Sequence, residues 1–226
     1  MIHLSLSKLK PGDLDAVVTL TERDVLSEEW MSVEMMGLRD REQQQVQDLQ
    51  ARLLRERLPL MNEATVWSRA IYPLLLLAEQ DSIQAWAQVE LSAQYKTFKL
   101  SGIADGVLGQ CIMGELKTPY LVVVEAKRGL EAENLKYQLY GQLLAAGRMN
   151  WQHHPQDPQE IFGCYTIADT WTFIRARISG LDTDKPALSL ESSRDYGEKV
   201  EAATILKLLK GIINGCLNPS PAAVSG

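Results

Sequence analysis

Two carboxylates and a lysine near the middle of the chain have the types and spacing for metal-dependent chemistry. Asp105 precedes Gly106, and Glu125 and Lys127 end an apolar run that begins at Tyr120. Residues two apart on a strand point to the same face, so Glu125 and Lys127 share a face. Carboxylates suit a hard divalent cation, which can polarise a phosphoryl oxygen and acidify a bound water. The lysine can orient that water or neutralise developing charge. The pattern therefore favours phosphodiester cleavage.

A second Glu-x-Lys sequence competes with this assignment. Glu115 and Lys117 lie between Gly114 and Pro119, which predicts a turn. The copy at Glu125 ends an apolar strand, where a rigid site is better built, and we therefore assign the site to it. The alternatives are ordinary structural roles, in which Asp105 is a turn residue before a glycine and the Glu-x-Lys pair is a solvated strand end.

Glu63 is the third candidate carboxylate. Asn62 is a suitable N-cap for a helix that runs to about Glu79, with a kink expected at Pro73. Glu63 falls on the same predicted stripe as Trp67, Ala70, Leu74 and Leu77. A carboxylate on a buried stripe is costly unless it is paired or bound to a metal, which favours a role in the site. The alternative is a half-exposed residue that stabilises the helix N-terminus.

The surrounding segments predict a mixed sheet with helices on both faces. A helical segment over residues 1–60 is expected to pack on the core, which spans 61–217, and the tail 218–226 has the composition of a disordered segment. After the helix at Asn62, the apolar patterns predict the following elements: strands near 85–95, 97–107 and 120–127, a helix over 131–150, strands at 161–167 and 171–178, and a closing helix over 198–216.

Together these residues resemble the PD-(D/E)XK nuclease superfamily, also called restriction-endonuclease-like. The match covers roughly residues 62–178. The helix start Asn62-Glu63-Ala64-Thr65, followed by Tyr72-Pro73-Leu74-Leu75, looks most like the N-terminal nuclease domains of type I restriction subunits. The chain departs from the family pattern at Ala104, where many members carry proline before the aspartate.

The resemblance implies a restriction-endonuclease-like α/β fold and a nuclease that uses Mg²⁺ or Mn²⁺. Asp105, Glu125 and the Ala126 carbonyl would hold the cation, and Lys127 would position or help deprotonate the attacking water. Glu63 would hold a metal-bound water or a second cation. The resemblance also implies a glutamine on the following helix beside the site. Gln138 matches that position, and Gln142 stands where some members carry a tyrosine.

Composition limits the choice of partners. The net charge of −6 weighs against tight non-specific DNA binding, so a local basic face would have to come from a few residues: Lys96, Lys99, Lys117, Lys127, Arg128 and Lys136. No apolar run is long enough to span a membrane. Three widely spaced cysteines suggest reduced thiols in a cytoplasmic protein.

We therefore expect nucleic acid as the partner, with DNA favoured over RNA. Two readings remain open beside an active nuclease. The chain could be a catalytically silent binding or assembly module, or it could be a subunit that acts as a homodimer or with a DNA-processing partner protein.

Overall fold

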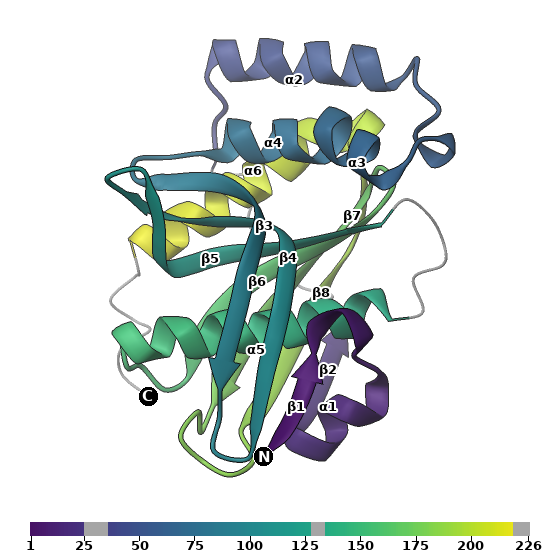
Figure 1. Cartoon of the computed structure of the whole chain (residues 1–226). Coiled ribbons are helices and arrows are strands. Elements are labelled where there is room, and N and C mark those ends of the chain that lie inside the picture. The colour runs from purple at the N-terminus through teal and green to yellow at the C-terminus, as the bar shows by residue number, and fades with distance from the viewer. Residues whose placement is uncertain (25–35, 128–133, 219–226) are drawn as a thin grey trace.

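The computed structural model describes residues 1–24, 36–127 and 134–218 (Figure 1). They form a mixed α/β structure around a curled sheet. The strands are β1 (Ile2–Ser5), β2 (Thr19–Asp24), β3 (Ile83–Gln94), β4 (Phe98–Ile112), β5 (Glu115–Lys127), β6 (Gln159–Ile167), β7 (Thr170–Ser179) and β8 (Ala187–Gly197). The α-helices are α1 (Pro11–Val17), α2 (Asp40–Leu53), α3 (Glu63–Val66), α4 (Tyr72–Ala78), α5 (Leu135–His153) and α6 (Glu198–Leu217).

The sheet forks at β4. Its strand order is β1-β4-β5-β6-β7-β8-β2, and β3 pairs along the other edge of β4. On the edge that β3 leaves free, residues 98–101 of β4 pair with β1 and residues 106–112 pair with β5. Within the described chain, residues 102–105 pair with neither strand, so β1 and β5 diverge on either side of this short stretch.

Helices cover both faces of the sheet and bury two apolar clusters (Figure 1). The first cluster lies between the sheet and helices α2, α3, α4 and α6. The second lies between the opposite face and helices α1 and α5. Val122 and Val124 of β5 belong to the first cluster and Val123 to the second. The predicted central strand is therefore covered on both faces, as its unbroken apolar run requires.

The predicted mixed sheet with helices on both faces is confirmed, but the N-terminal segment differs from the expectation. Residues 1–60, expected to be helical, also supply β1 and β2. Both strands pair in parallel with distant segments, β1 with β4 and β2 with β8. Strands this short show too little alternation of apolar and polar residues to be recognised in the sequence. They form because they can pair with an edge of the sheet. Of the predicted tail, all but Asn218 lies outside the described residues.

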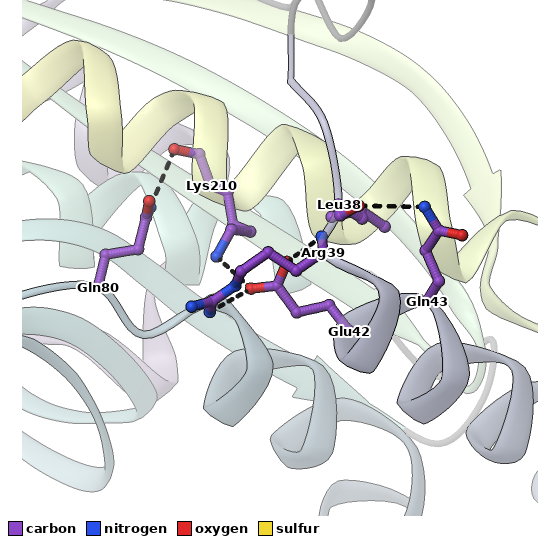
Figure 2. A network of polar contacts seen from close by, with 6 residues as sticks. All are labelled: Leu38, Arg39, Glu42, Gln43, Gln80 and Lys210. Carbon is purple, nitrogen blue, oxygen red and sulfur yellow. Dashed lines mark hydrogen bonds and ion pairs between the residues drawn. The ribbon is translucent and has the colours of Figure 1, made fainter.

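Helix α2 is fixed on α6 by buried charges (Figure 2). Lys210 Nζ of α6 lies 2.9 Å from Glu42 Oε1, and both side chains are less than a tenth exposed. The same carboxylate accepts the Arg39 guanidinium at 2.7 Å and the Arg39 backbone N–H at 2.8 Å. These contacts hold the pKa of Glu42 down at about 2 despite the opposing effect of burial. The pair fixes the position of α2 along α6.

Candidate active site at the fork of the sheet

The fork places Asp105 beside the end of β5. The backbone pairing between β4 and β5 ends at Gly106 and Val124, and past this pair the Ala126 N–H donates to Asp105 Oδ2 at 2.8 Å. The Lys127 carbonyl accepts the Ala168 N–H on the β6 side. Because backbone groups alternate sides along a strand, the Ala126 carbonyl faces Asp105. The Ala126 oxygen is thus directed toward the same edge as the carboxylate, and its role as a cation ligand stays a prediction.

Glu125 is buried under α5, and its two oxygens have different partners. Its Oε2 accepts the Gln142 amide at 2.6 Å, and the same Nε2 lies 3.3 Å from the Ile103 carbonyl. Its Oε1 forms an ion pair with Lys127 Nζ at 2.9 Å and has no other polar partner among the described residues. A cation that binds Oε1 would therefore share this oxygen with the lysine amine.

Lys127 connects the two acidic positions. Its amine lies 2.9 Å from Glu125 and 3.4 Å from Glu63 Oε1. The sequence predicted Glu63 on a buried stripe, but its side chain is 47% exposed. Glu63 is the first residue of α3, where a side chain has few neighbours, and the π-helical turn Trp67–Ile71 interrupts the predicted helix between α3 and α4. Glu63 therefore contacts the site from its rim.

Gln88 completes the surroundings of Asp105 from the neighbouring strand. Its amide lies 3.3 Å from Asp105 Oδ1, and its backbone has φ +54°, which is uncommon for a residue with a side chain. Both strands change faces here. Val89 and Ala104 pack in the cluster under α5, whereas Ala85 and Leu108, on the other side of the Gln88–Asp105 pair, pack in the opposite cluster. The bend directs the Asp105 carboxylate into the fork.

Burial and mutual repulsion dominate the electrostatics. Burial and the nearby Asp105 charge raise the pKa of Glu125 to about 7, against the opposing effects of Lys127 and Gln142. Burial also raises the pKa of Asp105, although the Ala126 N–H and Lys127 oppose it. Burial alone would lower the pKa of Lys127, but the surrounding carboxylates raise it. The lysine is therefore a cation between carboxylates that repel each other.

The donor set fits a divalent cation, with few protein ligands. In the described part of the chain, no three His, Cys, Asp or Glu side chains are placed to hold a metal ion together. Asp105, Glu125 and the Ala126 carbonyl offer two carboxylates and one backbone oxygen. Oxygen ligands of this kind suit Mg²⁺ or Mn²⁺, which usually keep several waters and few protein ligands. The raised pKa values of Asp105 and Glu125, caused by burial and by their mutual repulsion, support the fit, because a bound cation would relieve that repulsion.

The structure brings Asp105, Glu125, Lys127 and Glu63 together. The Gln138 side chain forms no hydrogen bond to any described residue, and its role in the site stays a prediction. Gln142, one turn later, occupies the expected position against Glu125. The competing Glu115 and Lys117 pair with each other at the far end of β5. They begin a strand rather than forming the predicted turn.

Sequence reasoning also missed Gln88, because nothing in the sequence of the predicted strand 85–95 distinguishes it from an ordinary strand residue. Comparison with known proteins adds no assignment: the sequence matches no protein-family description, and no curated protein matches it. Within the described residues, no helix is long and apolar enough to span a membrane.

Proposed function

We propose that the chain is a nuclease that hydrolyses phosphodiester bonds with Mg²⁺ or Mn²⁺, with DNA as the expected substrate. One observation carries the proposal. Asp105, Glu125 and Lys127 come from two strands and converge where the sheet forks, with the Lys127 amine paired to the buried Glu125 carboxylate. The order of a helix, three antiparallel strands, a helix and a parallel strand, from α3 to β6, supports the restriction-endonuclease-like fold.

Each side chain then has a separate task. Asp105, Glu125 and the Ala126 carbonyl would hold the cation, which when bound supplies polarisation of the phosphate and acidification of a water. Lys127, between Glu125 and Glu63, orients the attacking water and neutralises charge that develops on the phosphate oxygens. Gln142 fixes Glu125, and the Ala126 N–H fixes Asp105. Glu63 holds water at the exposed rim.

The test compares two lysines from equivalent sequence patterns. Wild type, Lys127→Ala and Lys117→Ala would be incubated with single- and double-stranded DNA and RNA in Mg²⁺, Mn²⁺ or EDTA. We expect slow cleavage that requires the ion, is reduced at least about 100-fold in Lys127→Ala and persists in Lys117→Ala. Equal cleavage by wild type and Lys127→Ala would assign the activity to another site or a contaminant.

A silent binding or assembly module is the second candidate, and the surface charges favour it. The expected basic face is largely neutralised, because its lysines form ion pairs: Lys96 with Asp182, Lys117 with Glu115, Lys127 with Glu125 and Glu63, and Lys136 with Glu22. Few charges remain to attract a polyanion. No cleavage of any substrate, together with no binding of either ion, would establish this alternative over the nuclease.

A further inference from the structure

A cavity of about 320 Å³ lies on the same side of the sheet as the candidate site. It is formed by the first turns of α5, the ends of β2 and β6, and the middle of β7 and β8. Its polar and aromatic lining comprises Glu22, Arg23, Asp24, Lys136, Tyr140, Tyr165 and Ser192. The volume is at the low end for a small-molecule site, which suits one nucleotide rather than a long ligand.

The cavity continues from the candidate site. Tyr165 of β6 is the direct partner of Glu125 in the parallel register, so the two side chains project from the same face of the sheet. Helix α5 borders both places, with Gln142 on Glu125 and Tyr140 on the cavity wall. A chain whose phosphate lies at Glu125 and Lys127 can therefore place its next nucleotide over Tyr165.

The lining is electrically balanced and rich in rings. Glu22 Oε1 accepts both the Lys136 amine at 2.9 Å and the Tyr140 hydroxyl at 2.8 Å, which neutralises two of the charges inside. Arg23 is exposed and forms no ion pair with any described residue. The Tyr165 hydroxyl likewise forms no hydrogen bond within the described ranges. These two groups are available to a ligand.

We propose that this cavity binds one unpaired nucleotide of a single-stranded nucleic acid, next to the phosphate that is cleaved. The base stacks on Tyr165, as bases stack on aromatic side chains in single-strand-binding proteins. Arg23 contacts the following phosphate. A paired base cannot enter a cavity of this size without leaving its duplex. The inference rests on the proposed nuclease function and adds a preference for single-stranded or frayed substrates.

Binding in EDTA tests the cavity without cleavage. The probes are a fluorescent ten-residue oligothymidine and a blunt-ended duplex of two complementary strands, measured by anisotropy with wild type, Tyr165→Ala and Tyr165→Phe. We expect Tyr165→Ala to weaken oligothymidine binding by about 5- to 150-fold, the range for loss of one stacked base. Tyr165→Phe keeps the ring and should bind like wild type, and duplex binding should be the same in all three.

Arg23→Ala provides a second measurement at an exposed position that does not endanger folding. The salt dependence of oligothymidine binding should become shallower by about 0.7 in the log–log slope, the value for one lost phosphate contact on a single strand. No oligothymidine binding by wild type, or unchanged binding in both Tyr165→Ala and Arg23→Ala, would overturn the proposal.

The outcomes separate this inference from the nuclease function. If cleavage depends on Lys127 but not on Tyr165 or Arg23, the nuclease function is retained and the nucleotide-binding role of the cavity is rejected. Oligothymidine binding that depends on Tyr165, without cleavage in Mg²⁺ or Mn²⁺, retains the cavity and rejects the nuclease.

Discussion

Asp105 accepts the backbone N–H of Ala126 at 2.8 Å, in the place where a ladder hydrogen bond between β4 and β5 would otherwise form. The Asp105 side chain thus links β4 to the end of β5 and at the same time directs its carboxylate toward Glu125. The same carboxylate therefore maintains the contact between the two strands and would bind the proposed cation.

The first prediction concerns Asp105→Asn. The amide oxygen can still accept the Ala126 N–H, so the fold should persist, but one cation ligand loses its charge. An ion at about 100 times its Kd stabilises a protein by about 2.7 kcal/mol, so Mg²⁺ or Mn²⁺ should raise the Tm of wild type by about 5–10 °C. Differential scanning calorimetry should show most of that rise lost in Asp105→Asn.

The matched control for this experiment is Asp182→Asn. Asp182 forms an exposed ion pair with Lys96 and lies outside the site. Its variant should keep the full response to the ion. Equal rises in wild type and Asp105→Asn would place the bound ion elsewhere.

The second prediction concerns Glu63→Gln. Glu63 is about half exposed and contacts Lys127 at 3.4 Å, so the variant should unfold within about 0.5 kcal/mol of wild type. Cleavage should fall by about tenfold or less, because Gln can still hold water at the rim. Steady-state kinetics of Glu63→Gln and Lys127→Ala would show which variant loses more cleavage activity. A larger loss in Glu63→Gln would indicate that Glu63 binds the cation directly.

The third prediction concerns Gln88, whose φ of +54° glycine adopts without strain. Relief of about 1–2 kcal/mol should offset the greater freedom of the unfolded chain in Gln88→Gly. Its Tm should equal or exceed that of wild type, while its affinity for Mn²⁺ falls because Asp105 loses a hydrogen-bond donor. Chemical denaturation and Mn²⁺ titration measure the two effects.

Gln84→Gly is the control for Gln88→Gly. Gln84 is an exposed residue of the same strand with ordinary extended backbone. Glycine there should cost about 0.5–1 kcal/mol and leave Mn²⁺ binding unchanged. Similar destabilisation in both variants would show that the backbone at Gln88 is not strained.

The strand that carries Glu125 and Lys127 could be predicted from the sequence, because an unbroken apolar run of this length is typical of a buried central strand. The sequence could also place Asp105 on the adjacent strand. It could not reveal the fork, because β1 joins β4 from almost a hundred residues away. Gln142 rather than Gln138 reaches Glu125 because the position of α5 over the sheet decides which turn meets the site.

The fourth prediction concerns the buried pair in Figure 2. Lys210→Met leaves Glu42 with Arg39 as its remaining basic partner among the described residues, and should lower the free energy of unfolding by about 1.5–3 kcal/mol, the range for a lost hydrogen bond to a charged group. The double variant Glu42→Gln/Lys210→Met removes both charges and should recover at least half of that loss. Urea denaturation of the two single variants and the double variant gives the coupling. Additive losses would show that the pair does not act as a unit.

The last prediction concerns the pH dependence of stability at Glu198, the first residue of α6. Glu198 is not one of the proposed cation ligands. Its Oε2 accepts the Trp171 indole N–H at 2.9 Å, whereas its buried Oε1 has no hydrogen-bond partner. Burial raises the pKa of Glu198 from 4.5 to about 8; Asp169 adds to this effect, and Trp171 and Arg52 oppose it. The folded protein therefore keeps this proton at pH values where the unfolded chain has lost it.

The sign of the pH dependence follows from that difference. The protonated carboxyl contributes stability that is fully present below pH 4.5 and is lost as the pH rises toward 8, at up to about 1.4 kcal/mol per pH unit. Glu198→Gln cannot ionise, so its unfolding free energy relative to wild type should increase between pH 5 and pH 8 and then level off. Urea denaturation across pH 4–9 would measure this difference. The exposed Glu90→Gln serves as the control and should track wild type, and a constant difference for Glu198→Gln would show that its carboxyl titrates normally in the fold.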